Sequence, residues 1–497
     1  MDNLPTEIMV MILDLLDFKS QTRLIFTTKI NKYLTEYWTI TEKIYINEKV
    51  LKWPHYDHLI NICIHELLII YPKKLQYLTF SRYFYGPINK DNIPKTVIHI
   101  KFGENFNQKV NKLPSSIKSI KFGENFNQTV DKLLSGDCSI RRKPSSIKNI
   151  EFGNFFNQKV DKLPSSIESI KFGHNFNQSV DNLPSSIESI KFGYYFNQTV
   201  DKLPSLIKSI KFGDDFNQTV DKLPSSIKSI EFGENFNQTV DKLPSSIESI
   251  KFGRNFNQSV DNLPSSIESI KFGHRFNQTV DKLPSLIKSI KFGDDFNQTV
   301  DKLPSSIKSI KFGENFNQTV DKLPSSIKSI EFGHRFNKSV DKLSSSIKSI
   351  KFGSLFNRLV DKLPSSIKSI EFGYFFNQSI KKLPSTLTHL GISWKFNQPL
   401  EDISPSVTHL IIYCERFNGK IPETVTHLKI HSFQYKEEHI PPTVTHLTII
   451  GVELKNKKIP KTVTHLTLDT FEDIIIPETV TTLMVNEKNR KKKKLKC

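Results

Sequence analysis

The sequence predicts a mainly β solenoid, a fold in which each successive coil of the chain contributes one short strand. Two observations predict it, a 20-residue repeat and an apolar pattern that fits one short strand in each repeat. Phe172 and Phe192 mark the period, which continues to Phe372 and is interrupted once by an insertion at 134–143. The repeat therefore accounts for most of the chain.

The coil at 163–182 reads LPSSIESIKFGHNFNQSVDN and shows the pattern in full. Its apolar positions fit neither a 3.6-residue period nor a strict two-residue period over the whole coil, and only Ile170 to Phe172 alternates as a strand does. A coil of this kind cannot bury its apolar face alone, so we expect the coils to stack with every Phe over a Phe.

Three further positions of the coil are expected to serve the fold. Gly123 and its equivalents follow the strand, where a positive φ would turn the chain at little steric cost. Pro164 and its equivalents are expected to keep the chain extended, because proline lacks an N–H and has a fixed φ. Asn127 and its equivalents could serve a glycan, a ligand or a stacked column of amides, and the amide column is favoured because the N-terminus does not read as a secretory signal.

The repeat resembles two related families. The spacing of Ile117, Ile120 and Phe122 is similar to the L-x-x-L-x-L core of leucine-rich repeats. FNQPL at 396–400, FNGKIP at 417–422 and the recurrent VTHL or LTHL more closely resemble FNIP repeats, a leucine-rich-repeat-like family. The resemblance implies an FNIP-repeat solenoid over 95–485, preceded at 45–94 by degenerate coils that form an N-terminal cap.

A duplication indicates a candidate partner-binding face. Residues 161–240 and 241–320 are nearly identical blocks of four coils that differ at four positions, all along one edge of the predicted strand face. Solenoids bind partners through such faces, although exposed positions also tolerate drift. Aromatic residues at the same edge favour binding. The candidate residues are Phe155, His174, Tyr194, Tyr195, Glu231, Arg254, His274, Arg275, Lys311, Tyr374 and Phe375.

A column of histidines occupies an outward position of the later strands. Imidazoles can bind metals, but these side chains are expected to point in parallel instead of converging on one ion. The sequence therefore favours a structural column over a metal site. The column consists of His389, His409, His427, His446 and His465.

The first 44 residues read as a small α-helical domain. Residues 4–18 place their apolar side chains on one face of a helix. LPTEI at 4–8 resembles the opening of an F-box, a family that docks onto the Skp-type adaptor of a Skp–cullin–F-box ubiquitin ligase. A small helical cap on the first coil is the alternative. The resemblance implies adaptor contacts by Leu4, Pro5, Glu7, Ile8, Met11, Ile12, Leu15 and Leu16.

The chain carries a formal net charge of +19, of which the tail at 486–497 supplies seven basic residues against one acid. We expect this tail to be disordered and to act as a nuclear-localisation signal or an electrostatic tether, or simply to be a solvated end. Across the coils, an acidic column that includes Asp131, Asp161 and Asp181 opposes the lysines. Nucleic acid is therefore not the expected partner.

Composition also bounds the compartment and the chemistry. The four cysteines lie far apart without metal or redox spacing, and the N-terminus resembles neither a secretory signal nor a membrane span. We therefore expect a cytoplasmic protein without a membrane partner, and the basic tail adds the nucleus as a second location. No phosphate loop, nucleophile elbow or zinc spacing is present, so we expect no catalysis, cofactor or metal in this chain.

Two functional hypotheses follow. In the first, the chain is a non-catalytic substrate-recognition subunit of a Skp–cullin–F-box ligase, in which the helices bind the adaptor and the solenoid binds an unknown target protein. In the second, it is a non-ligase scaffold or decoy for protein–protein interaction. Chains that pair an F-box with FNIP repeats resemble those of giant DNA viruses and amoebae, which implies activity directed at a host cell.

Overall fold

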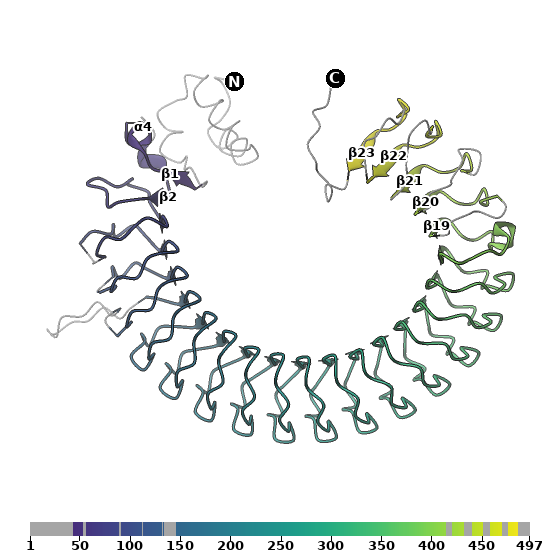
Figure 1. Ribbon diagram of the computed structural model, residues 1–497, viewed down its shortest axis with the longest axis horizontal. Coiled ribbons are helices and arrows are strands. Elements are labelled where there is room, and N and C mark those ends of the chain that lie inside the picture. The colour runs from purple at the N-terminus through teal and green to yellow at the C-terminus, as the bar shows by residue number, and fades with distance from the viewer. Residues whose placement is uncertain are drawn as a thin grey trace, which may run out of the picture. The chain divides into compact units, whose positions relative to one another are not determined.

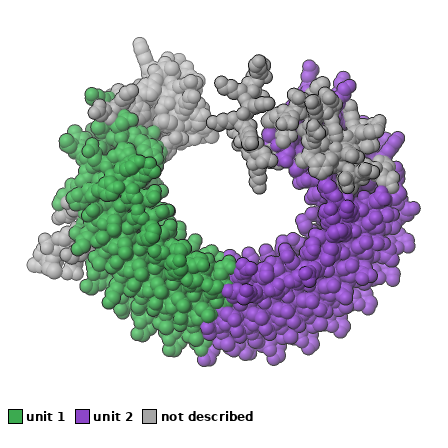
Figure 2. Space-filling view, viewed as in Figure 1, with its two compact units in different colours: residues 1–236 green, residues 237–497 purple. Residues whose placement is uncertain are grey.

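A computed structural model describes residues 43–52, 56–88, 91–111, 113–131, 133, 146–413, 420–431, 440–450, 458–469 and 476–485. The chain divides into two compact units, Met1–Phe236 and Asn237–Cys497, here called unit 1 and unit 2 and coloured separately in Figure 2. Within each unit the coils stack side by side and the strands line the inner side of the stack (Figure 1). The predicted helical domain, up to residue 42, and the basic tail lie outside the described residues.

Unit 1 is a ladder of parallel strands, each paired with the next one along the sequence. The register advances by one coil, so that Ser169 lies beside Ser189 and Lys171 beside Lys191. The elements are β1 (Ile44–Tyr45), α4 (Glu48–Leu51), η1 (Tyr56–His58), β2 (Asn61–Ile64), β3 (Tyr77–Phe80), β4 (His99–Lys101), β5 (Ser119–Lys121), β6 (Asn149–Glu151), β7 (Ser169–Lys171), β8 (Ser189–Lys191), β9 (Ser209–Lys211) and β10 (Ser229–Glu231).

Unit 2 continues the same pattern, with strands that lengthen from three to four residues at β18. Its strands also pair in parallel with their neighbours in sequence. The elements are β11 (Ser249–Lys251), β12 (Ser269–Lys271), β13 (Ser289–Lys291), β14 (Ser309–Lys311), β15 (Ser329–Glu331), β16 (Ser349–Lys351), β17 (Ser369–Glu371), β18 (His389–Ile392), η2 (Leu400–Asp402), β19 (His409–Ile412), β20 (His427–Ile430), β21 (His446–Ile449), β22 (His465–Leu468) and β23 (Thr482–Val485).

Two columns of phenylalanine fill the interior of the stack. The rings of Phe172 and Phe176 lie 3.8 Å apart within one coil, and those of Phe172 and Phe192 lie 5.7 Å apart in successive coils with an interplanar angle of 7°. Each of these side chains is almost fully buried, which stabilises the fold by about 2–3 kcal/mol per ring. The predicted β solenoid with Phe stacked over Phe is confirmed.

The glycine after each strand has a different role from the expected one. From Gly103 to Gly233 and from Gly273 to Gly373, no glycine at this position has a positive φ, so the prediction of a left-handed turn is wrong. The glycine is needed because the coils approach closely, and a Cβ on Gly353 would lie 1.7 Å from the carbonyl oxygen of Gly333. The coils from Gly103 to Gly373 therefore need a residue without a side chain at this point.

The proline of each coil stands at the start of a turn. The carbonyl of Pro164 accepts the N–H of Ile167 at 3.3 Å. The serine two residues after the proline joins neighbouring coils, since Ser186 Oγ donates to the carbonyl of Ile167 at 2.6 Å. These turns stack along the coil edge.

The recurrent asparagine forms the amide column that its repetition suggested. The backbone N–H of Asn317 donates to Oδ1 of Asn297 at 2.9 Å, and Gln318 Nε2 donates to the same oxygen at 3.3 Å. The same Asn-to-Asn bond runs from Asn127 to Asn107 and on through later coils. Each amide oxygen thus satisfies a backbone donor of the next coil.

We expect Gly353→Ala to destabilise unit 2 by at least about 2 kcal/mol, because the new Cβ meets backbone that cannot move without separating the coils. Urea unfolding followed by circular dichroism, with hydrogen exchange of the coils around 353, measures the effect. Ser365→Ala, at an exposed position, serves as the control. An unchanged urea midpoint for Gly353→Ala would contradict the close-approach explanation.

We expect Asn317→Ala to lower the free energy of unfolding by about 1–2 kcal/mol. The N–H of Asn337 lies 3.0 Å from Oδ1 of Asn317 and loses this acceptor in the variant. Asn317→Asp keeps an acceptor and should cost less. Asp at 297, 317 and 337 together should cost more than the sum of the single changes, because neighbouring carboxylates repel. Thermal unfolding compares the variants, and equal stability of Asn317→Ala and the unchanged chain would refute the amide column.

Candidate functional site

The outward side chain at the third position of each short strand forms a column of lysine and glutamate. In unit 1, Lys121 and Lys171 lie 2.8 and 2.5 Å from the carboxylate of Glu151 between them. Burial alone would raise the pKa of Glu151, but hydrogen bonds from the two lysines hold that pKa below its usual value. Parallel register places like positions side by side, so a glutamate between two lysines makes the column locally favourable, whereas Lys171 and Lys191 lie next to each other without a glutamate between them.

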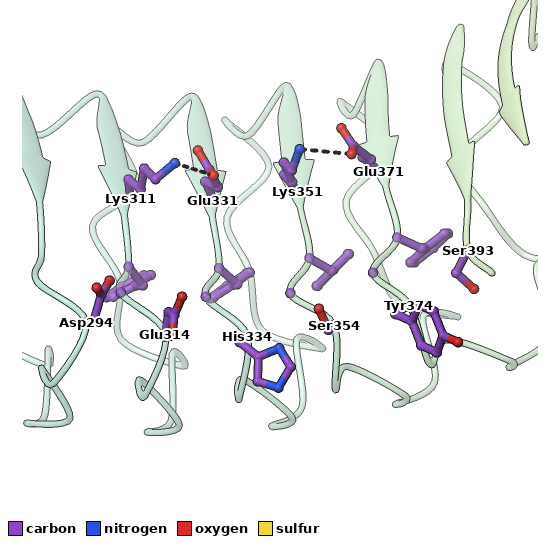
Figure 3. A pocket seen from close by; sticks show the side chains of 18 of the residues that line it. Asp294, Lys311, Glu314, Glu331, His334, Lys351, Ser354, Glu371, Tyr374 and Ser393 are labelled. Atoms are coloured by element: carbon purple, nitrogen blue, oxygen red, sulfur yellow. Dashed lines mark hydrogen bonds and ion pairs between the residues drawn. The ribbon is translucent and has the colours of Figure 1, made fainter. Parts of the chain in front are cut away.

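Unit 2 contains a groove of about 560 Å³ alongside this column, between residues 294 and 413. Figure 3 shows the strand residues on one side of the groove and the residues that follow each glycine on the other. The first wall holds two ion pairs, Lys311 with Glu331 at 2.5 Å and Lys351 with Glu371 at 2.9 Å. The second wall consists of Asp294, Glu314, His334, Ser354, Tyr374 and Trp394.

The floor of the groove is the glycine column, Gly313, Gly333, Gly353 and Gly373, over the buried phenylalanines. The glycine column ends after Gly373. Ile392 and Ile412 pair in register, so the residues that follow them, Ser393 and Tyr413, occupy the glycine position of their coils. Ser393 is buried and donates to the carbonyl of Phe376 at 2.7 Å. The phenol of Tyr413 lines this end, so the first bulky side chain at the floor position closes the groove.

The groove and the neighbouring surface carry opposite charge. Four carboxylates and two ammonium groups line the groove, although the chain as a whole is strongly basic. By contrast, each of the strands β14 to β17 is preceded by an exposed lysine. Within the described residues, none of these four lysines forms an ion pair. These lysines are Lys308, Lys328, Lys348 and Lys368.

In unit 1, three of the predicted partner-binding residues gather in one aromatic cluster after β7 and β8. The rings of His174 and Tyr194 are stacked with centroids 4.8 Å apart, and Tyr195 packs edge-on against both. Tyr194 and Tyr195 are 39% and 46% exposed, so the cluster presents aromatic surface to solvent. Nearby Asp215, with a smaller contribution from burial, raises the pKa of Tyr194. Glu231, the fourth candidate in this block, forms an ion pair with Lys211 at 2.6 Å.

The equivalent positions of the second block carry two arginines, Arg254 and Arg275, and one histidine, His274. His274 lies 3.8 Å from the carboxylate of Asp294 and 3.4 Å from that of Asp295. Arg254 and Arg275 belong to the same surface of unit 2, while Lys311 lines the groove. The four differences between the blocks therefore all fall on the strand face or the turn that follows it.

The remaining candidates lie in separate places. Tyr374 lines the groove, where its ring stacks on Trp394 at 6.3 Å and an angle of 6°, and Phe375 packs edge-on against Tyr374 outside the groove. Phe155 is exposed in unit 1. The adaptor-contact residues, Leu4 to Leu16, lie outside the described residues.

Sequence reasoning missed the residues that shape the closed end of the groove, Trp394 and Tyr413, and the exposed Leu206 and Leu286. The signal for the closed end was present in the repeat. Aligning the coils shows that glycine recurs through Gly373 and is then replaced by serine and tyrosine.

The predicted histidine column forms a continuous stack in unit 2. Neighbouring rings from His389 to His465 lie 4.1 Å apart, at angles of 10–17°. Each Nδ1 lies 2.8–3.0 Å from the hydroxyl of the preceding threonine. The hydroxyl also lies near a backbone carbonyl of the preceding coil, as Thr464 Oγ1 does at 3.2 Å from the carbonyl oxygen of Thr445.

The stack favours neutral imidazoles. Burial, and then the neighbouring histidines, lower the pKa of His409, His427 and His446. The rings lie parallel, so their Nε2 atoms do not converge on a common point. Within the described residues, no group of three or more His, Cys, Asp or Glu side chains is arranged to hold a metal ion. Within the same residues, no helix is long and apolar enough to cross a bilayer.

The parallel ladder, the stacked coils and the strand face define a leucine-rich-repeat-like solenoid. The FNIP Repeat family matches more than half of the chain, so the chain belongs to the FNIP repeat family. The first match begins inside the region predicted to be degenerate coils, and the last ends before β19. The matches cover 70–105, 106–133, 144–175, 156–195, 176–203, 196–235, 236–275, 276–314, 299–335, 336–375 and 359–395.

Solved structures share this fold. The crystal structure of CroV588, described as a novel circular LRR protein structure, has a TM-score of 0.74 and 29% sequence identity, covering 91% of this chain and 81% of that chain. A TLR13–ssRNA13 complex has a TM-score of 0.51 and 10% identity, covering 90% of this chain and 83% of that chain. The comparison with curated proteins finds no significant match.

The histidine stack predicts a specific pH dependence. Because the pKa values of His409, His427 and His446 are lowered in the folded state, the unfolded chain binds more protons below about pH 6.5. Stability should therefore fall as the pH drops from 7.5 to 5.5, and the melting temperature measures this fall.

His427→Gln should reduce the difference in melting temperature between these two pH values, because it removes a titrating ring from the middle of the stack. The matched control is His334→Gln, which changes an exposed histidine outside the stack. An equal effect of the two variants would show that the stack does not cause the pH dependence.

Proposed function

We propose that this chain is the substrate-recognition subunit of a Skp–cullin–F-box type ubiquitin ligase. In this proposal the N-terminal segment that resembles an F-box recruits the Skp-type adaptor, and the FNIP repeats bind a target protein. The proposal builds on what the repeats establish, a leucine-rich-repeat-like solenoid suited to protein–protein interaction.

The observation that carries the binding role is the groove of unit 2. It combines two ion pairs on the wall formed by the strands with the carboxylates of Asp294 and Glu314 and the rings of Tyr374 and Trp394 on the opposite wall. Aromatic anchors beside charged groups are typical of protein-binding surfaces. The exposed aromatic cluster of His174, Tyr194 and Tyr195 in unit 1 offers a second contact region.

In a receptor of this type the chain performs no chemistry. The assembled ligase transfers ubiquitin, and the solenoid contributes proximity and orientation by holding the target near the ligase. The proposed location is the cytoplasm, with the basic segment at 486–497 as the signal for entry into the nucleus. The pairing of an F-box-like segment with FNIP repeats supports a host-directed role of the giant-virus or amoebal type.

A non-ligase scaffold or decoy is the competing function. It uses the same strand face and groove to hold a partner, and its N-terminal segment serves as a cap. The two functions differ only in whether the chain recruits the adaptor, so a single binding experiment separates them.

We expect the full-length chain to retain a Skp-type adaptor and its cullin in a pull-down, and a Leu4→Asp, Ile8→Asp double variant to lose them. Glu314→Lys, a change in the groove of unit 2, is the matched control and should leave adaptor retention unchanged. Circular dichroism checks that the variants keep the solenoid. Failure of the folded full-length chain to retain the adaptor would favour the scaffold.

A further inference from the structure

We infer that the groove of unit 2 binds an extended peptide segment of its target. The segment places an aromatic or large aliphatic side chain at the end closed by Tyr413 and a basic side chain about six residues away, beside Asp294 and Glu314. This site deepens the proposed function, on which it rests, because it defines the chemistry of the target segment.

The groove selects for positive charge. Counting His334 as neutral, four carboxylates against two ammonium groups leave a net charge of two negatives along its walls. Lys311 and Lys351 are already held by Glu331 and Glu371. The carboxylate of Glu314 is exposed and forms no ion pair or hydrogen bond within the described residues, so it is available to a basic ligand side chain.

The closed end selects for an apolar anchor. Tyr374 is 41% exposed and stacks on Trp394, and Tyr413 stands at the end of the glycine floor. Burial, and then the charge of Glu371, raise the pKa of Tyr413, so its phenol stays neutral. Three aromatic rings around a closed end favour an aromatic or aliphatic side chain that leaves water.

The width of the groove favours an extended chain over a helix. The two walls are three residues apart along each coil, as Lys351 and Ser354 are, so their Cα atoms are separated by at most about 10 Å. Side chains occupy part of this width. A helix with its side chains is about 10–12 Å across and does not fit, whereas an extended chain can lie on a floor that carries no side chains.

The spacing of the two anchors follows from the repeat. Trp394 and Glu314 are four coils apart, and parallel neighbours lie about 4.8 Å from each other, which gives about 19 Å. An extended peptide rises about 3.3 Å per residue, so about six residues separate the apolar anchor from the basic one.

Selection from a phage library of random dodecapeptides on the full-length chain tests the inference. We expect enriched peptides to carry an aromatic or large aliphatic residue and an Arg or Lys five to seven positions apart. An enriched peptide, synthesised with a fluorescein label, then gives its affinity by fluorescence anisotropy. Enrichment of acidic peptides, or failure to enrich any common pattern, would overturn the inference.

Variants locate the bound peptide. Glu314→Lys and Tyr374→Ser both change exposed positions. Each should lower the affinity for the labelled peptide at least tenfold. The duplication supplies the matched control, Glu234→Lys, because Glu234 lies in unit 1 in the same segment, FGENFNQTV, as Glu314, without the closed aromatic end. An affinity loss from Glu234→Lys equal to that from Glu314→Lys would show that the peptide does not lie in this groove.

Two further arms separate the alternatives. If the chain's own basic segment occupied the groove, replacing Lys491, Lys492, Lys493 and Lys494 by Ser in the full-length chain would raise peptide affinity, whereas we expect no change. Adaptor retention is measured separately with Leu4→Asp, Ile8→Asp. Loss of peptide binding with adaptor retained would refute the groove site alone, and peptide binding without adaptor retention would refute the ligase role alone.

Discussion

The close approach of successive coils is the constraint on which the rest of the structure depends. The backbone after each strand passes so near the preceding coil that a Cβ on Gly173 would lie 1.8 Å from the carbonyl oxygen of Gly153. This approach brings each strand into parallel register with its neighbour and each Phe ring onto the next. From Gly103 to Gly373 the glycine permits this approach and, because it leaves the floor bare, also the groove.

Register makes each position of the coil a column of like residues, and this creates an electrostatic problem. Amide and aromatic columns stack favourably because they are neutral, as Asn297 and Asn317 show. Charged columns need partners. Aspartates are paired with lysines of the next coil, for example Lys322 with Asp301 at 3.0 Å. In the strand column a glutamate such as Glu231 pairs with a neighbouring lysine, although other lysines, such as Lys171 and Lys191, lie side by side. These exposed pairs each contribute about 0–1 kcal/mol, so their main effect is to remove repulsion. In the histidine stack, the lowered pKa of the inner rings His409, His427 and His446 favours their neutral form.

The sequence predicted most of the fold because a repeat makes the consequences of one coil visible many times. The 20-residue period, the strand near Ile170 and the Phe stacking all follow from apolar spacing. The role of Gly123 could not be predicted, since a positive φ and a close approach of two coils both favour glycine in the sequence. The groove was partly predicted through Lys311 and Tyr374. Its closed end was not, because Tyr413 matters only through its alignment with the glycine column.

The residues of the groove that differ from coil to coil can fix the position of a bound peptide, which identical coils cannot do. A groove built from identical rungs would let a bound peptide shift by one coil, about 4.8 Å, without a change in free energy. Such a groove could hold a ligand but could not fix its register. In unit 2 the wall changes from acidic at Asp294 to aromatic at Trp394, and Tyr413 closes the floor. Each shift then exchanges a favourable contact for an unfavourable one, so the non-repeating residues determine which ligand position is the stable one.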